Sequence, residues 1–193
     1  MIGKNALVTG STRGIGKATA EALAAEGCNV MLSGFGDPVK IEAECTRMAN
    51  TYGVNVAYNG ADLSKEDDCD ELVDAATEIL GPIEILVNNA VIRYFHDIAE
   101  FPREEWQHAL AVNVTAPFIL TQRVLADMRE RKWGRIINFS SVLGVAARSG
   151  RADYVVSKHA MLGLTRATAA EVRDIEGITC NAICPGTVES PSL

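Results

Sequence analysis

A tyrosine and a lysine one helical turn apart are the first residues in this chain that could carry out chemistry together. Tyr154 and Lys158 lie in the segment Tyr-Val-Val-Ser-Lys, shortly after Ser141. In a helix, side chains at this spacing share one face, about 5–6 Å apart at Cβ. A free phenol has a pKa of about 10, and a unit charge about 4 Å away supplies roughly 4 kcal/mol at an effective dielectric of about 20. The lysine ammonium is therefore expected to favour ionisation of the phenol, which can then exchange protons near neutral pH.

The segment TGSTRGIG, residues 9–16, has the composition of a phosphate-binding loop. Its glycines, Gly10, Gly14 and Gly16, lie between an expected strand and an expected helix. Without side chains, they let backbone amides approach a pyrophosphate at the helix N-terminus. The first two glycines are more widely spaced than in the common dinucleotide fingerprint, and a plain tight turn is the alternative. The strand-turn-helix setting leads us to predict dinucleotide binding.

Short β-rich runs alternate with longer helical stretches along the whole chain. We expect strands near residues 4–8, 29–33, 54–58, 83–87, 135–139 and 178–182, and helices near 14–26, 39–52, 65–80, 103–131 and 152–173. Such alternation implies βαβ crossovers and a parallel sheet covered on both faces. The prediction is one α/β domain over residues 1–193, a Rossmann-like doubly wound parallel sheet. Pro117 is expected to kink the helix at 103–131 or to divide it in two.

The composition excludes several classes of function. A length of 193 residues, 48% of them hydrophobic, suits one soluble domain, and the net charge of −7 opposes nonspecific nucleic-acid binding. The five cysteines are scattered and odd in number, which argues against a disulfide framework or a zinc site. We expect reduced thiols in a cytoplasmic protein with no metal, no signal peptide and no apolar run long enough to span a membrane. His96, His108 and His159 form no metal-ligand pattern, and we interpret them as surface or packing residues.

Taken in order, the motifs resemble those of the short-chain dehydrogenase/reductase family, over essentially the whole chain. These motifs are the glycine loop, Asn88-Asn89-Ala90, Asn113, Ser141, Tyr154 with Lys158, and Pro185-Gly186. The resemblance implies that Tyr154 exchanges a proton with the substrate oxygen while a nicotinamide exchanges a hydride with the substrate carbon. Ser141 would hydrogen-bond that oxygen, Lys158 would hold the nicotinamide ribose, and Asn113 would position a water that continues the proton path. A noncatalytic dinucleotide-sensing protein on the same fold is the alternative.

The resemblance also predicts which residues contact the cofactor. Asp62 would bind the adenine ring, although it could instead cap the next helix, for which Ser64 is the better candidate. The full expected set is Gly10, Thr12, Arg13, Gly14, Ile15, Gly16, Phe35, Asp62, Leu63, Asn89, Tyr154, Lys158, Pro185 and Gly186.

The choice between NAD and NADP depends on the end of the second strand, where an acid favours the ribose hydroxyl and a base favours the phosphate. Residues 33–37 contain no base and resemble the matching stretch of NAD-linked 3-hydroxybutyrate dehydrogenases, but Gly34 occupies the usual acid position and Asp37 follows three residues later. Arg13 resembles the phosphate-binding arginine of NADPH-linked 3-oxoacyl-carrier-protein reductases. We expect NAD, with NADP and a 3-oxoacyl reductase activity as the alternative.

Around Ser141 the sequence departs from the hydroxybutyrate dehydrogenase pattern. Leu143 replaces a substrate-binding His, Arg93 replaces a Gln, and Arg151 replaces a Lys. Two guanidinium groups would suit an anionic substrate, whereas solvated surface arginines are the alternative. The expected substrate contacts are Ser141, Leu143, Arg93 and Arg151, and the expected substrate is a hydroxy acid such as 3-hydroxybutyrate, an acidic sugar, or a phosphorylated or thioester-linked acyl group.

Two further expectations come from the resemblance alone. Helices of the family form subunit interfaces, so we expect a homo-oligomer, a dimer or a tetramer. Family members continue after the Pro-Gly motif into a substrate lid and a last strand, whereas this sequence ends at Leu193. We therefore expect a C-terminally truncated domain, with weak turnover if the protein ends there.

Overall fold

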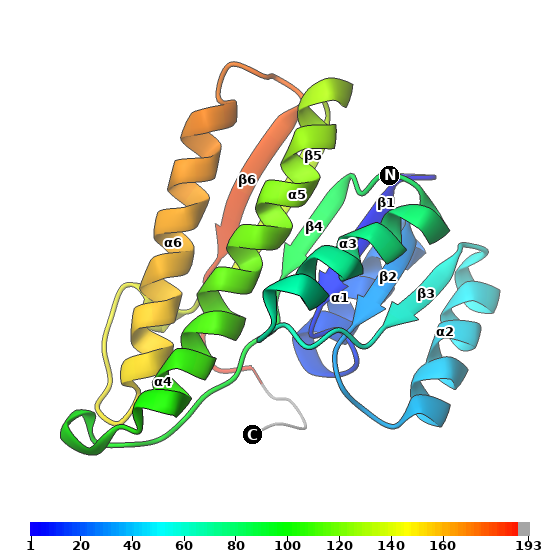
Figure 1. Ribbon diagram of the computed structural model, residues 1–193. Coiled ribbons are helices and arrows are strands. Elements are labelled where there is room, and N and C mark those ends of the chain that lie inside the picture. The colour runs from blue at the N-terminus through cyan, green and yellow to red at the C-terminus, as the bar shows by residue number, and fades with distance from the viewer. Residues whose placement is uncertain (189–193) are drawn as a thin grey trace.

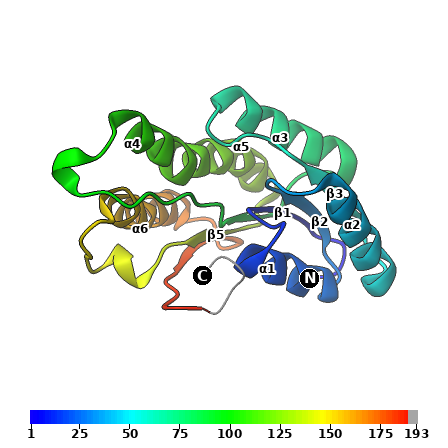
Figure 2. The same cartoon turned by 90° about the horizontal axis from the view of Figure 1, so that it is seen from below.

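A six-stranded parallel sheet forms the centre of the protein (Figures 1 and 2). The computed structural model describes residues 1–188, and residues 189–193 lie outside the described part. The strand order is β3-β2-β1-β4-β5-β6, and every neighbouring pair is parallel. The strands are β1 Asn5–Thr9, β2 Asn29–Ser33, β3 Val56–Asn59, β4 Ile85–Asn88, β5 Gly134–Phe139 and β6 Ile178–Ile183. The predicted doubly wound α/β architecture is confirmed.

Helices cover both faces of the sheet, because alternate strand residues point to opposite sides. Leu7, Met31 and Leu86 pack with α3 and α5 on one face, while Val8, Val30 and Val87 pack with α1 on the other. In Figure 2, α1 lies across the sheet from α3 and α5. The helices are α1 Gly14–Ala25, α2 Pro38–Tyr52, α3 Glu66–Leu80, α4 Arg103–Leu110, α5 Ala116–Arg131 and α6 Ala152–Val172. Their bounds agree with the predicted ones to within the usual one or two residues, except at 103–131.

The helical stretch at 103–131 is neither one α-helix nor two separate ones. A π-helical turn, Ala111–Thr115, joins α4 to α5. Pro117 lies in the first turn of α5, where its missing N–H costs little. The π-helical turn carries Asn113 and turns its side chain toward the loop after β4.

This same stretch bears on the prediction that no apolar run is long enough to span a membrane. By length and composition alone, Arg103–Arg131 is apolar enough to cross a bilayer. Half of its apolar window is buried inside the protein, and α5 contributes Leu120, Val124 and Met128 to the core. Packing on the sheet accounts for the composition, so the stretch is weak evidence for a membrane span.

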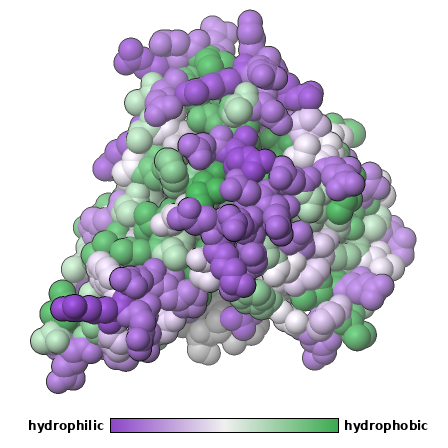
Figure 3. All heavy atoms as spheres, in the orientation of Figure 1, coloured by the Kyte–Doolittle hydropathy of each residue, from purple (hydrophilic) through white to green (hydrophobic). Residues whose placement is uncertain are grey.

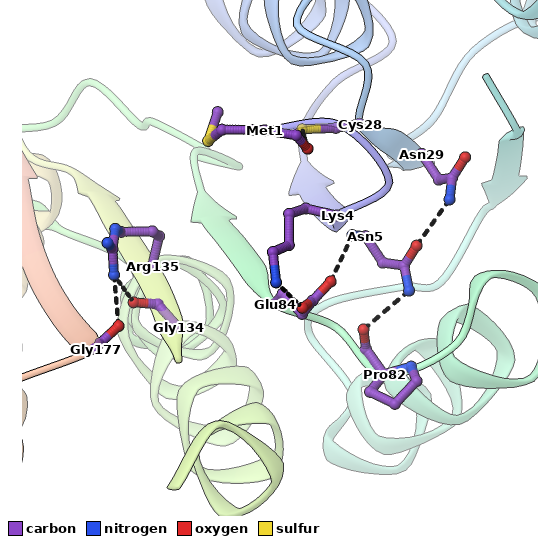
Figure 4. Close-up of polar contacts among 10 residues, drawn as sticks. All are labelled: Met1, Lys4, Asn5, Cys28, Asn29, Pro82, Glu84, Gly134, Arg135 and Gly177. Atoms are coloured by element: carbon purple, nitrogen blue, oxygen red, sulfur yellow. Dashed lines mark hydrogen bonds and ion pairs between the residues drawn. The ribbon is translucent and has the colours of Figure 1, made fainter. Parts of the chain in front are cut away.

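Polar side chains join the strands at the N-terminal edge of the sheet (Figure 4). Lys4 Nζ lies 2.6 Å from Glu84 Oε1, and the Asn5 side chain donates to the Pro82 carbonyl. Asn29 Nδ2 donates to Asn5 Oδ1 over 2.9 Å. The carboxylate of Glu84 also accepts from the Asn5 backbone N–H, and β4 begins only after it, two residues later than predicted.

At the centre of the sheet, Asn88 is buried and joins two strands through its side chain. Asn88 Nδ2 donates to Asn138 Oδ1 over 2.9 Å, and Asn138 Nδ2 donates to Thr165 Oγ1 of α6 over the same distance. Buried amides need such partners, since an unpaired polar group costs about 1–3 kcal/mol. This chain of amides fixes α6 against the strands whose ends carry the site described below.

Candidate active site

One cavity of about 580 Å³ lies at the C-terminal ends of the strands. Its walls come from the loops after β1, β2, β4 and β5, the start of α6, and residues 185–188. The strand order reverses between β1 and β4, and open α/β sheets bind ligands at such a point. All the predicted cofactor and substrate residues line this cavity, as do Ser141, Tyr154 and Lys158. Asn113 is the one predicted site residue that is not on the wall.

The glycine loop has the backbone geometry of an anion cradle. Gly10 and Gly14 have positive φ angles of 63° and 58°, which residues with side chains rarely adopt. A Cβ on Gly16 would lie 2.2 Å from the Gly10 carbonyl oxygen and 2.4 Å from Asn89 Nδ2. Arg13 is the N-cap of α1 and makes no side-chain capping bond, so the first amides of the helix are left for a ligand. The loop therefore fits the pyrophosphate of a dinucleotide.

Asn89 holds this loop against the end of β4. Its Nδ2 donates to the Thr9 carbonyl over 2.9 Å and to the Gly10 carbonyl over 3.1 Å. Thr9 Oγ1 in turn accepts from the backbone N–H groups of Asn89 and Ala90. Thr12 closes the other side, where its hydroxyl donates to the Phe35 carbonyl over 2.9 Å. These contacts give the cradle a fixed shape before any ligand enters.

Tyr154 and Lys158 face the cavity from consecutive turns of α6, as their spacing predicts. Lys158 Nζ lies 5.5 Å from the centroid of the Tyr154 ring and donates to the Phe139 carbonyl over 2.6 Å. The ammonium is almost completely buried, and this burial, together with the nearby Arg93, lowers the pKa of Lys158 to about 8. The Arg93 guanidinium carbon lies 5.9 Å from the same phenol ring. Two cationic groups therefore lie within 6 Å of the centre of the Tyr154 ring.

Ser141 follows β5 and is buried at the edge of the cavity. Its Oγ accepts the backbone N–H of Leu143 over 3.1 Å, which orients the hydroxyl. Because that contact uses a lone pair, the O–H proton is left for an oxygen in the cavity.

Asn113 lies behind the cavity wall, where its side chain bonds to the loop after β4. Its Oδ1 accepts from the Ile92 N–H and its Nδ2 donates to the Ile92 carbonyl, each over 2.9 Å. A longer contact of 3.4 Å reaches Ser157 Oγ. The side chain thus holds the segment that carries Arg93.

At the expected adenine end, Asp62 lines the cavity and Ser64 does not cap α3. Asp62 Oδ1 accepts from both the N–H and the hydroxyl of Ser64, and these bonds lower the pKa of Asp62. The N-cap of α3 is Lys65, which makes no side-chain capping bond. The prediction of a Ser64 cap is wrong because Asp62 uses that hydroxyl. Glu66 and the acids that follow it in the first turn complement the helix dipole instead.

Comparison with known proteins agrees with this geometry. Residues 4–193 match the family model described as short chain dehydrogenase. The chain belongs to the short-chain dehydrogenase family. As a member, it is an NAD(P)-dependent oxidoreductase that acts on a small molecule.

The curated relatives of this dehydrogenase include two kinds of enzyme. The chain is 43% identical to a D-beta-hydroxybutyrate dehydrogenase of Cupriavidus necator, a match that covers 98% of this chain and 72% of that protein. It is 38% identical to the enzyme of the same name in Rhizobium meliloti, with coverage of 97% and 72%. A 3-oxoacyl-acyl-carrier-protein reductase of Aquifex aeolicus is 37% identical, with coverage of 97% and 75%.

Among the cavity residues of the dehydrogenase that were not predicted from the sequence are one arginine and one histidine. Arg148 lines the wall from the loop before α6, where no periodic pattern marks it. Its only signal was a second arginine close before Tyr154, three residues ahead of Arg151. His108 also lines the cavity, and its Nδ1 lies 2.8 Å from the Tyr94 hydroxyl. Within residues 1–188 no group of three or more potential ligands could hold a metal ion.

The pKa of Lys158 predicts the pH dependence of the reductive reaction. Below about pH 8 the Lys158 side chain is an ammonium, and above it the side chain is a neutral amine. Since kcat/KM reports ionisations of the free enzyme, we expect kcat/KM for carbonyl reduction to fall as the pH rises through about 8. Steady-state assays across this range test the prediction, and a profile that stays level for a further pH unit would contradict it.

Proposed function

We propose that this dehydrogenase interconverts a small anionic hydroxy acid and the corresponding oxo acid. The observation that carries the proposal is the position of Tyr154, whose ring lies 5.5 Å from the Lys158 ammonium and 5.9 Å from the Arg93 guanidinium in the same cavity as the glycine loop. Cations beside a phenol stabilise the negative charge that develops on its oxygen when it gives its proton to a substrate.

Each residue of this group has a defined part in the proposed reaction. A bound nicotinamide would supply or accept the hydride. Tyr154 gives its proton to the carbonyl oxygen during reduction and takes it back during oxidation. Ser141 donates its O–H to the same oxygen, a preorganised donor for developing negative charge. Lys158 stabilises the phenolate, and Asn113 fixes the loop beside it and, by family resemblance, positions a water for proton exchange with solvent.

The proposed substrate class rests on the arginines near Tyr154 and on the names of the relatives. Arg93 and Arg151 present guanidinium groups to the cavity, and guanidinium binds carboxylates through paired hydrogen bonds. Two of the relatives are named for hydroxybutyrate, a hydroxy acid. The carboxylate of an acidic sugar could pair with the same two guanidinium groups.

The proposal is tested by following nicotinamide absorbance with the full-length protein against a panel of hydroxy acids, oxo acids, sugars and simple alcohols, with each cofactor. Turnover of acids in preference to uncharged alcohols supports it. Binding of a dinucleotide without turnover of any compound would instead favour a noncatalytic sensor.

One observation favours a second candidate, an NADPH-dependent 3-oxoacyl reductase. Asp37 is the nearest acid to the end of β2. Its carboxylate caps α2 by accepting from the Val39 and Lys40 N–H groups, so it is used there and not as the ribose-binding acid of an NAD enzyme. Gly34 has no side chain to offer, whereas Arg13 is exposed at the cavity and has no ion-pair partner among the described residues. NAD is our first expectation from the sequence, and these contacts support NADP.

Replacement of Arg13 distinguishes the two cofactors. A hydrogen bond to a charged group contributes about 1.5–3 kcal/mol, so if Arg13 binds a phosphate, Arg13→Gln should lower the ratio of kcat/KM with NADPH to kcat/KM with NADH about tenfold to a hundredfold. Steady-state kinetics with both cofactors measure the ratio. An unchanged ratio, with NADH preferred by the wild type, would leave NAD as the cofactor.

Two broader expectations stay predictions. Phe118 of α5 and Val156 of α6 are exposed apolar side chains, and Figure 3 shows hydrophobic areas among the hydrophilic ones on this side of the molecule. These exposed apolar side chains support a homo-oligomer, and the molar mass from light scattering would test it. All five cysteines are free, which supports a cytoplasmic protein.

A further inference from the structure

The cavity is lined by charged side chains that are mainly positive, although the protein as a whole is negatively charged. Five cationic side chains and one carboxylate line it, although the net charge of the chain is −7. Arg13 and Asp62 lie beside the glycine loop and its neighbouring strand, at the end proposed for adenosine, and Lys158 is committed to Tyr154. The other three cations, Arg93, Arg148 and Arg151, which we call the arginine cluster, come from the two loops that flank Tyr154.

The arginine cluster is held by the fold. The backbone of Ile92 is bonded to Asn113 on both its N–H and its carbonyl, and the Tyr94 N–H donates to Asp153 Oδ2 over 2.9 Å. Arg93 therefore projects from between two fixed residues. The Arg151 guanidinium carbon lies 3.6 Å from the centroid of the Phe95 ring, a cation–π contact that orients it.

None of the three arginines has an ion-pair partner among residues 1–188. Elsewhere among the described residues, Arg47 pairs with Glu21 and Glu44 and Arg123 pairs with Asp70 and Asp74, whereas Arg131 and Arg166 have no ion pair. The carboxylate nearest in sequence, Asp153, is fully buried and accepts the Tyr94 backbone N–H. What distinguishes Arg93, Arg148 and Arg151 is that all three line the same cavity.

The three guanidinium groups also act on one another. Partial burial lowers the pKa of Arg151, and so do the charges of Arg93 and Arg148. Like charges gathered without a counter-ion destabilise the free protein, and a bound anion relieves their repulsion. One carboxylate has two oxygens and is satisfied by a single bidentate guanidinium, so a monoanion leaves charge in the cluster uncompensated.

We propose that the substrate carries two negative charges, one held by Arg93 beside Tyr154 and the other, remote from the reacting carbon, held by Arg148 and Arg151. The chemical class is a hydroxy or oxo acid with a second anionic group, either a carboxylate or a phosphate. This inference rests on the proposed function and narrows it from monoanionic to dianionic acids.

Matched oxo acids test the inference with the full-length protein. The pair 3-oxobutyrate and 3-oxoglutarate differs by one terminal carboxylate, the monomethyl ester of 3-oxoglutarate keeps the size without the second charge, and a phosphorylated 3-oxo acid tests phosphate. We expect kcat/KM for one dianion to exceed that for both monoanions at least about tenfold, which corresponds to about 1.4 kcal/mol, mainly through KM. The better dianion identifies the second group.

Substitution within the arginine cluster shows whether it causes the preference. Arg148→Gln and Arg151→Gln should each lower the ratio of kcat/KM for the dianion to kcat/KM for its monoanionic partner about fivefold or more. Arg131→Gln, at the far end of α5, is the matched control and should leave the ratio unchanged.

Three results would overturn the inference. If 3-oxobutyrate is reduced as well as the dianions are, or if the ratio is the same in the cluster variants as in the wild type, the inference fails while the proposed function stands. If no carbonyl compound is reduced at all, the proposed function fails and this inference fails with it.

Discussion

Replacing Tyr154 by phenylalanine is expected to lower kcat about a hundredfold to ten-thousandfold, the usual contribution of a positioned general acid. The substitution removes only the hydroxyl, so the aromatic ring near Lys158 and Arg93 remains in place. Steady-state and single-turnover assays of carbonyl reduction measure the loss, while a fluorescence titration of the reduced nicotinamide checks that the cofactor still binds.

Tyr52→Phe is the matched control for this prediction. The Tyr52 hydroxyl donates to Glu21 over 3.2 Å and lies away from the cavity, so its removal should leave kcat unchanged. A Tyr154→Phe variant that retains more than about a tenth of the wild-type kcat would show that the proton comes from another group.

Gly16→Ala is expected to weaken cofactor binding about a hundredfold, which corresponds to about 2.7 kcal/mol. The added methyl group would lie 2.2 Å from the Gly10 carbonyl oxygen, so the loop must move away from α1. Gly10 has a positive φ and its carbonyl is held by Asn89, which leaves little freedom for that movement. Overpacking of this kind should also lower the free energy of unfolding by about 1–3 kcal/mol.

The control is Gly163→Ala in α6, where the added methyl group would meet nothing within 4 Å. In a helix interior this change is expected to raise the free energy of unfolding by about 0.5–1 kcal/mol. Calorimetric titration and denaturant unfolding measure both effects. Equal cofactor affinity in the two variants would contradict the assignment of residues 9–16 as the pyrophosphate site.

The sequence predicted the architecture because its signals are local and repeated. β1, β2 and β4 are short, largely apolar runs buried on both faces, and helices connect the strands, so the parallel sheet follows from the alternation. The spacing of Tyr154 and Lys158 in one helix likewise fixed their common direction. These features need no knowledge of distant contacts.

The features that the sequence did not predict depend on contacts between distant segments. The π-helical turn at Ala111–Thr115 lets Asn113 reach the Ile92 backbone, and no pattern within the helix requires this. Asp37 could have bound a ribose or capped a helix, and only the geometry at the start of α2 decides for the cap.

Arg148 belongs to an irregular loop. In such a loop the sequence shows which residues are present but not which way their side chains point. Its position on the cavity wall follows from how the loop after β5 returns to α6. Arg93 and Arg151 were predicted because the family resemblance assigned their positions. The charge of the cluster, however, became visible only when the two loops that carry these arginines were seen to meet at the cavity.

In the proposed reaction, the protein transfers a hydride between a nicotinamide and a carbon of its substrate, while Tyr154 gives or takes the proton. The most direct test is mass spectrometry of the alcohol formed by the full-length protein from an oxo acid and a reduced cofactor deuterated at its transferable position, with Tyr154→Phe as the blank. We predict one deuterium on the carbinol carbon of the product and almost no product from the variant. An unlabelled alcohol, or equal amounts of labelled alcohol from both proteins, would contradict the account.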